Sequence, residues 1–147
     1  MSLKLPDLIP DFRPQLAMAI AAMPASRLLG VEVMGFGDGV SVIMLPVRAE
    51  LTIDGRTVQG GLVGTLADYA AVSAATASAP PGWFSATTSF DVHNLAPAAG
   101  DRLIGIGRVI KAGRSQAVAA ADVYAETGEH HVLVATCLAT CRLLEPR

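Results

Sequence analysis

The sequence predicts an α+β fold in which a curved antiparallel sheet of about six strands wraps around one long central helix. The chain has 147 residues, the length of a single domain. Residues 60–79 form a run that is apolar on nearly every side, and β-type runs separated by turn residues lie before and after it. The concave face of a sheet can cover such a helix, whereas a sandwich of two sheets leaves no place for it.

The predicted central helix begins at Gly60 and is closed by Pro80-Pro81. Its length of about twenty residues is enough to cross a bilayer, so a membrane span has to be considered. Seven of its residues are alanine, however, and its only charged residue, Asp68, lies near the middle. These features are typical of a helix buried inside a soluble domain, and we expect no membrane partner.

Turn and breaker residues mark the other predicted elements. Pro14 and Pro24 bound a short helix, which belongs to a lead-in of residues 1–27 in the single domain 1–147. Gly37-Asp-Gly39 indicates a hairpin. The expected strands are residues 29–36, 40–47, 84–95, 102–111, 116–125 and 132–143.

The composition limits the partners of the protein. Hydrophobic residues make up 52% of the chain and charged residues 16%, which leaves little polar material to coat a monomer. We therefore expect some apolar surface to lie between copies of the chain. The net charge is -2 and the Lys and Arg residues are scattered, which argues against nucleic acid as a partner.

Cysteine usage and the first residues favour a cytoplasmic protein. Cys137 and Cys141 are the only cysteines and lie about 13 Å apart on one predicted strand, too far for a disulfide. We expect both to be reduced core residues. Residues 1–10 lack the continuous apolar run of a signal peptide. We expect no metal, because His130-His131 is better explained as a turn into a strand.

Asp68 is the leading candidate for a catalytic residue. A carboxylate placed on a buried stripe is costly unless it is paired, and the helix contains no Lys or Arg. A residue kept at that cost is a functional candidate. The alternative is that Asp68 faces solvent or an interface and only keeps the helix soluble. Its neighbours at helical spacing are all small or apolar: Gly61, Gly64, Thr65, Ala71, Val72 and Ala75.

Gln59-Gly-Gly61 comes immediately before the predicted helix. The free N–H groups of the first helical turn are exposed there without side chains in front of them, and such groups can stabilise an oxyanion. Two glycines are also common at a plain junction between a loop and a helix, so both interpretations remain open.

The segment Val58-Gln-Gly-Gly-Leu-Val-Gly-Thr-Leu-Ala-Asp-Tyr-Ala70 resembles the His-Gly-Gly and Leu-Ala-Asp signature of hotdog-fold acyl-CoA thioesterases of the phenylacetate-pathway (PaaI-like) type. The carboxylate falls nine residues after the His position, as in that family. The similarity continues through residues 87–97, 100–103 and 109–115 and the last strand. It implies a hotdog fold and hydrolysis of an acyl-CoA thioester to the free acid and CoA, without a metal or a cofactor other than the CoA of the substrate.

The resemblance also implies roles for individual residues. Asp68 would act as nucleophile on the thioester carbonyl or as general base toward water. The Gly61 N–H would bind the thioester oxygen, with Gln59 at the His position, and Thr87 would orient the water or the carboxylate across a dimer interface. The assembly implied is a homodimer or a dimer of dimers. Further substrate contacts are expected at Gly60 and Thr65 and, near the pantetheine or phosphate end of CoA, at Lys111, Gly113, Arg114 and Ser115.

Two positions depart from the pattern of the family. Gln59 replaces the usual His, and Ile53 stands where one branch has Asn or Gln. Glutamine can bond the acyl carbonyl or cap the helix, but it cannot carry a proton near neutral pH. The alternative function is therefore a non-catalytic acyl-CoA-binding hotdog protein. A hydratase or dehydratase would need a His near Asp68 on the helix, and the helix has none.

Other polar residues are open to two interpretations. Thr87, Ser89, Asp91 and His93 alternate along one predicted strand and are expected on one face, either lining an acyl pocket or lying on the surface. Trp83-Phe84 is expected to pack against the end of the helix.

Overall fold

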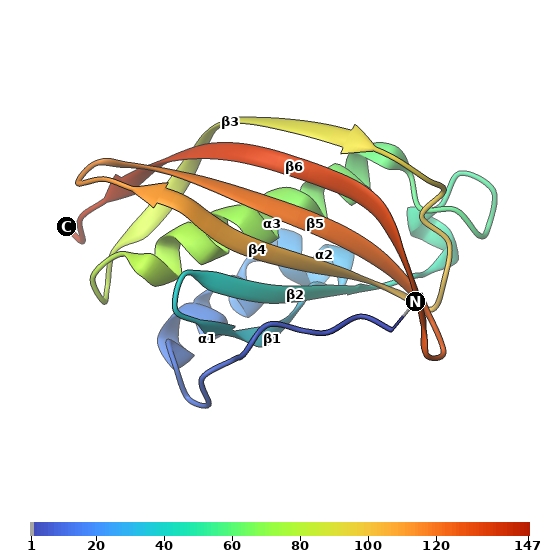
Figure 1. Cartoon of the computed structure of the whole chain (residues 1–147), viewed down its shortest axis with the longest axis horizontal. Coiled ribbons are helices and arrows are strands. Elements are labelled where there is room, and N and C mark those ends of the chain that lie inside the picture. Colours follow the sequence, from blue (N-terminus) through green and yellow to red (C-terminus); the bar gives the residue numbers. More distant parts are fainter. Residues whose placement is uncertain (1) are drawn as a thin grey trace.

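The computed structural model describes residues 2–147, which form an antiparallel sheet of six strands together with three α-helices (Figure 1). The order of strands across the sheet is β1-β2-β4-β5-β6-β3, so β1 and β3 are its two edges. The helices are α1 (Pro14–Ala22), α2 (Pro24–Leu29) and α3 (Gly60–Ser78), and a 3₁₀ turn, η1, covers Ala49–Leu51. The strands are β1 (Glu32–Gly37), β2 (Val40–Pro46), β3 (Phe84–Asn94), β4 (Arg102–Ala112), β5 (Gln116–Thr127) and β6 (His130–Leu144).

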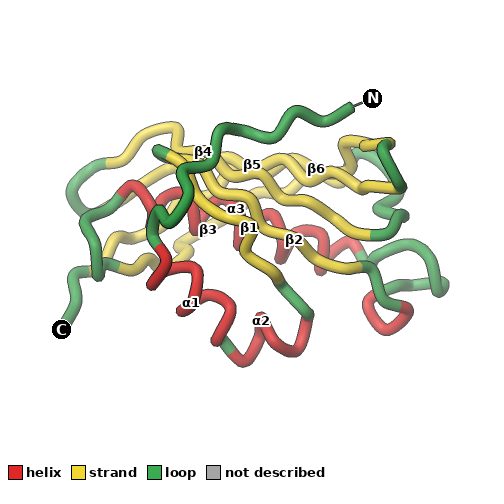
Figure 2. The backbone as a smooth tube through the Cα atoms, turned by 90° about the horizontal axis from the view of Figure 1, so that it is seen from below, coloured by secondary structure: helices red, strands yellow, loops and turns green. Residues whose placement is uncertain are grey.

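The sheet curves around α3, as the sequence predicts. Figure 2 shows the layers from below: the sheet lies above α3, and α1 and α2 lie on the far side of the helix from the sheet. The N-terminal segment crosses the outer face of the sheet before α1 begins (Figure 2). None of the helices within residues 2–147 has the length and hydropathy needed to cross a membrane.

The packing of α3 against the sheet depends on small residues. Most of the helix is buried, and only its two ends, at Gly60-Gly61 and Ser78, are exposed. Strand β4 approaches so closely at Gly107 that an added Cβ would lie 2.0 Å from the Ala70 carbonyl oxygen. A larger residue at 107 would push the helix away, so this glycine sets the depth at which α3 lies. The helix side of this contact is made of alanines: Ala67, Ala70, Ala71, Ala74 and Ala75, each with no exposed surface.

Strand β3 contains a bulge that changes which side chains face α3. The pairing of β3 with β6 shifts between Thr87 and Ser89. Thr87 points toward the helix, and after the bulge it is Phe90 and Val92 that approach Gly64 of α3. The expectation that Thr87, Ser89, Asp91 and His93 share one face is therefore wrong, because the extra residue reverses the alternation.

The lead-in is also more structured than the sequence predicts. Pro24 does not follow the end of the helical region but begins a second helix, α2, in which proline occupies the first turn. Gly30 then ends α2 in a left-handed conformation, with φ 78°, so the first strand starts at Glu32 rather than at residue 29. Cys137 and Cys141 are free and buried in β6, as expected.

Candidate active site

A groove of about 410 Å³ lies beside the middle of α3, between that helix, α1 and β3. Asp68 forms part of the wall of this groove, and most of the other lining residues are apolar. The groove residues are Leu16, Ala19 and Ile20 of α1, Met23 between α1 and α2, Asp68, Tyr69, Val72, Ser73 and Thr76 of α3, and Phe84, Ser85 and Thr87 of β3.

Asp68 is held by a single side chain from the neighbouring strand. The Thr87 hydroxyl donates a hydrogen bond of 2.8 Å to Asp68 Oδ1. Burial raises the pKa of Asp68 above its ordinary value, and the hydrogen bond from Thr87 opposes this in part. No Lys, Arg or His of residues 2–147 forms an ion pair with it. The carboxylate therefore keeps an oxygen free to accept a proton or to attack an electrophile.

The local structure explains why Thr87 reaches Asp68. Ser85 and Thr87 are two residues apart in β3 before the bulge, so both point toward α3. The Ser85 hydroxyl meets Thr76 Oγ1, and Thr76 in turn donates to the Val72 carbonyl oxygen at 2.8 Å. This chain of hydroxyls fixes the strand against the helix and holds Thr87 opposite Asp68.

The N-terminus of α3 presents free N–H groups, as the sequence predicts. The Gln59 side chain caps the helix, because its Oε1 accepts a hydrogen bond of 3.1 Å from the Leu62 N–H. The Gly60 and Gly61 N–H groups donate no hydrogen bond within the part of the chain that the structure describes. A Cβ on Gly61 would lie 2.9 Å from Gln59 Oε1, so the cap packs closely against this glycine. Gln59 is therefore the N-terminal cap of α3.

Within one chain, Gly61 and Asp68 lie too far apart to act on the same carbonyl group. Seven residues correspond to almost two full turns, so both lie on the same face of α3 but about 10 Å apart along its axis. Thr65 lies between them and donates its hydroxyl to the Gly61 carbonyl oxygen at 3.0 Å. Thr87 reaches Asp68 of its own chain, and its expected action across a dimer interface stays a prediction.

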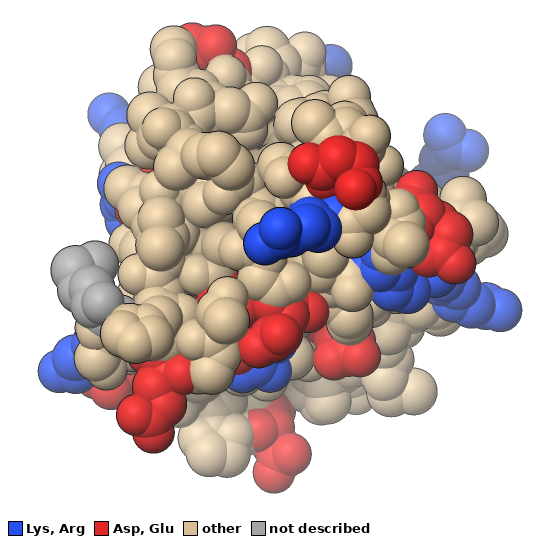
Figure 3. Space-filling view, turned by 90° about the vertical axis from the view of Figure 1, so that its right-hand side faces the viewer, with Lys and Arg blue, Asp and Glu red and all other residues tan. Residues whose placement is uncertain are grey.

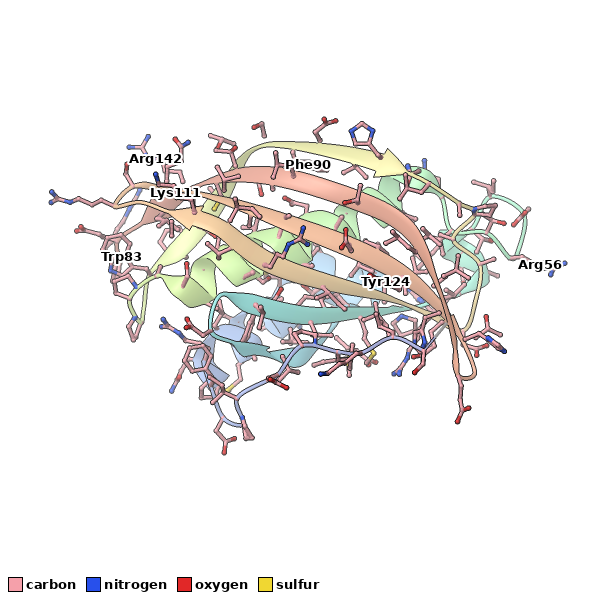
Figure 4. The ribbon with its side chains drawn as sticks, viewed as in Figure 1. Arg56, Trp83, Phe90, Lys111, Tyr124 and Arg142 are labelled. Carbon is pink, nitrogen blue, oxygen red and sulfur yellow. The ribbon has the colours of Figure 1, made fainter. Side chains whose placement is uncertain are left out.

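The residues predicted to contact CoA lie at the other end of the molecule from Gly61. Lys111 lies near the end of β4 and residues 113–115 form the turn to β5, and Figure 4 shows Lys111 and Trp83 at the same end of the molecule. Arg56, in the loop before α3, lies at the opposite end (Figure 4). At that opposite end acidic and basic side chains are interspersed (Figure 3), whereas Lys111 and Arg114 are exposed and form no ion pair within residues 2–147.

The other candidates from the sequence lie away from the groove. Asp91 and His93 are exposed and 3.3 Å apart, on the outer side of β3. Ile53 is exposed in the loop before α3. His131 is the second residue of β6 and lies 2.7 Å from Glu126, and no group of ligands suited to a metal occurs in residues 2–147. Burial raises the pKa of Cys137 to about 11, so this thiol is neutral at physiological pH.

Most of the wall of the groove could not be predicted from the sequence. Leu16 and Ile20 of α1 were expected only as part of a short helix, because nothing local indicates that they approach Asp68. Ser73 and Thr76 could have been suggested, since they follow Asp68 on the same helix. Phe84 was expected to pack against the helix end, but it lines the groove and stays half-exposed.

Comparison with solved structures confirms the fold. A thioesterase family protein from Silicibacter pomeroyi has a TM-score of 0.85 at 27% identity, over 91% of this chain and 98% of that one. Zebra fish thioesterase superfamily member 2 has a TM-score of 0.72 at 27% identity, over 87% and 93%. The E. coli PaaI protein from the phenylacetic acid degradation operon has a TM-score of 0.74 at 20% identity, over 90% and 96%. This likeness identifies the architecture as the hotdog fold of thioesterases.

Comparison of the sequence itself leads to the same family. A search among curated proteins gave no significant match. Residues 55–130, more than half of the chain, match the Thioesterase superfamily. The matched segment contains α3 with Asp68, the bulged strand β3 with Thr87, and the end of β4 with the turn at residues 113–115. Together with the shared fold, this match shows that the chain belongs to the Thioesterase superfamily.

Proposed function

We propose that this protein hydrolyses an acyl-CoA thioester to the free acid and CoA, with Asp68 as the catalytic carboxylate. The observation that carries the proposal is the environment of Asp68, a carboxylate without a cationic partner that lines an apolar groove and is held by Thr87. A carboxylate with a raised pKa is better suited to accept a proton than one at its ordinary value.

The reaction needs three groups that the chain supplies. Asp68 either attacks the thioester carbon, forming a mixed anhydride that water then hydrolyses, or removes a proton from the attacking water, and Thr87 orients the carboxylate. The free N–H of Gly61 stabilises the negative charge that develops on the thioester oxygen. The thiolate of CoA is the leaving group, and it takes up a proton on release.

We further propose that each site combines two chains. Two α3 helices packed antiparallel around a two-fold axis near Gly64 and Thr65 would place Gly61 of each chain beside Asp68 of the other. This arrangement removes the separation of about 10 Å that keeps the two groups apart within one chain. The substrate would then lie between Asp68 and Thr87 of one protomer and Gly61 and Gln59 of its partner.

The free edge of the sheet supports a dimer of this kind. Strand β3 has 11 residues, pairs with β6 on one side only, and is exposed over most of its length. An edge of this length that contains no proline is a template for pairing with a second strand. Because β3 lies beside α3 (Figure 1), pairing of two β3 strands would bring the two helices close together.

Mixed dimers test the two-chain site directly. Asp68→Asn removes the carboxylate, and Gly61→Pro removes an N–H of the first helical turn that has no hydrogen-bond partner within residues 2–147, while its ring displaces the Gln59 side chain that packs against Gly61. Each variant alone should be inactive. Unfolded and refolded together, they form mixed dimers in which one site carries both changes and the other neither, so about a quarter of the parental activity should return.

The outcome separates the two arrangements. If each site lies within one chain, every site in the mixed dimer carries one change and no activity returns. Circular dichroism and light scattering of the separate variants check that both are folded and have the assembly state of the parent. If the parent releases no thiol from a panel of acyl-CoAs but binds them, the non-catalytic alternative takes its place.

A further inference from the structure

We propose that the groove between α1 and the second half of α3 receives the acyl chain of the substrate, that it suits apolar unbranched chains of about ten carbon atoms, and that Ala19 of α1 is the residue that determines this specificity. The inference rests on the proposed function, because the chain is positioned by its thioester at Asp68.

The groove leads away from Asp68 in one direction. Its wall on α3 runs from Asp68 through Val72 to Thr76, all of which line it. The eight residue-to-residue steps from Asp68 to Thr76 rise about 12 Å along the helix axis. An extended chain advances about 1.2 Å per bond, a value that follows from the spacing of extended backbone, so about ten bonds fit.

The chemistry of the wall selects an apolar group. On the α1 side only hydrocarbon and thioether groups face the groove, from Leu16, Ala19, Ile20 and Met23. On the other side the hydroxyls of Thr76 and Ser85 are already bonded to each other and to the Val72 carbonyl oxygen. Beyond Asp68 and Thr87, the remaining hydroxyls of the lining residues are those of Tyr69, which contacts Ser26, and Ser73, so a charged or strongly polar acyl group would lose its water here and gain few partners.

The α1 wall is fixed in place at two points rather than loosely attached. Before α1, the Arg13 guanidinium donates from Nη2 to the carbonyl oxygens of Ala77, at 2.9 Å, and of Ala79 at the end of α3. After α1, Ser26 is fully buried and its Oγ lies 3.0 Å from the Tyr69 hydroxyl. Because both contacts join the lead-in to α3, the width of the groove is set before a ligand binds, which favours discrimination by size.

Two neighbouring residues of α1 provide a matched test. Ala19 lines the groove, and Ala19→Phe should fill it. Met18, the residue before it, is 71% exposed and does not line the groove, so Met18→Phe is the control. The ligands are S-octyl-CoA and S-methyl-CoA, thioethers that cannot be hydrolysed, and calorimetry gives their affinities. Thermal unfolding of both variants checks the fold, and Ala19→Ile serves as a smaller block.

The parent should bind S-octyl-CoA at least about tenfold more tightly than S-methyl-CoA, since each buried methylene contributes up to about fourfold. Ala19→Phe should remove that preference and leave the affinity for S-methyl-CoA unchanged, and Met18→Phe should match the parent. Equal affinities for the two thioethers in the parent, or an unchanged preference in the folded Ala19 variants, would overturn the proposal. A parent that shows the preference but hydrolyses neither octanoyl-CoA nor acetyl-CoA would refute only the hydrolysis.

Discussion

Asp68 and Glu126 are both partly buried carboxylates, and their surroundings shift their pKa values in opposite directions. Glu126 Oε1 accepts a hydrogen bond from Arg102 Nε, and its Oε2 lies 2.7 Å from His131 Nε2. The hydrogen bond from Arg102 is the main reason why the pKa of Glu126 is lowered. Asp68 has only the Thr87 hydroxyl, and burial raises its pKa.

The opposite pKa shifts distinguish a carboxylate suited to a structural role, Glu126, from one suited to catalysis, Asp68. Arg102 and His131 offset the cost of burying Glu126, and the cluster joins β4, β5 and β6 at one end of the sheet. Nothing comparable offsets the burial of Asp68. A carboxylate with a raised pKa and a free oxygen in a groove is suited to proton transfer or attack, whereas an ion-paired one is held in its charged form.

The largest effect is expected when the rates of thiol release of variants at the two carboxylates are compared. Asp68→Asn keeps the shape of the side chain but removes its charge, so the rate of thiol release should fall at least about 100-fold, the contribution of a general base or more. Glu126→Gln makes the same chemical change outside the groove and should leave the rate within about twofold of the parent. Asp68→Asn with near-parental hydrolysis would show that Asp68 is architectural.

A second prediction concerns the group that orients Asp68. Thr87→Val keeps the volume but removes the hydrogen bond to Asp68, which should lower kcat/KM by about tenfold, the value of one lost hydrogen bond. Because that bond lowers the pKa of Asp68, the pKa should rise and the acid limb of the pH–rate profile should move to higher pH. Thr88→Val, at the neighbouring residue that bonds the Thr140 carbonyl oxygen, is the control. Loss of activity without a shift of the limb would contradict an orienting role.

Replacing each carboxylate by its amide should change the stability of the fold in opposite directions. Glu126→Gln should lower the free energy of unfolding at pH 7 by about 1 kcal/mol, the scale of a partly exposed ion pair. The pKa of Glu126 is lowered in the fold, so its contribution is present above the ordinary value of 4.5 and is lost as the pH falls through the lowered pKa. The difference between Glu126→Gln and the parent should therefore shrink in acid.

Asp68→Asn should instead raise the melting temperature at pH 7. The pKa of Asp68 is raised in the fold. The folded parent therefore gains most stability from Asp68 below the ordinary pKa value of 3.8, where the group is protonated, and loses that contribution as the pH rises through the raised pKa. The amide is uncharged throughout, and its advantage should disappear below about pH 3.8. Melting curves of parent and variant from acid to neutral pH measure this, and a variant less stable at pH 7 would contradict it.

The smallest effect is expected at the proposed CoA end. Arg114→Ala should raise KM by no more than about fivefold with little change in kcat, because an exposed contact to a phosphate is made equally in the ground and transition states. Arg108→Ala, in which an ion pair with Asp122 on the outer face of the sheet is lost, is the control. A fall in kcat at constant KM would place Arg114 near the chemistry.

The parts of this protein that depend on local sequence patterns could be predicted. The boundaries of α3 follow from Gly60-Gly61 and Pro80-Pro81, and the strands follow from turn residues. Asp68 could be selected because a charge in the middle of an alanine-rich helix is conspicuous. The α1 wall of the groove could not be predicted, since it depends on Arg13 reaching the end of α3, more than sixty residues away. The bulge was missed because Thr87 and Thr88 are both ordinary strand residues.

The bulge in β3 has a consequence for interpreting variation along this strand. Up to Thr87 the odd-numbered positions belong to the inner layer, and beyond Ser89 the even-numbered positions do. Tolerance to substitution should therefore change parity at this point: hydrophobic size matters at Phe90 and Val92, whereas charge is acceptable at Asp91. Homologous strands without the bulge have to be aligned with a one-residue gap here, or every position after it will be compared with a residue from the opposite side of the sheet.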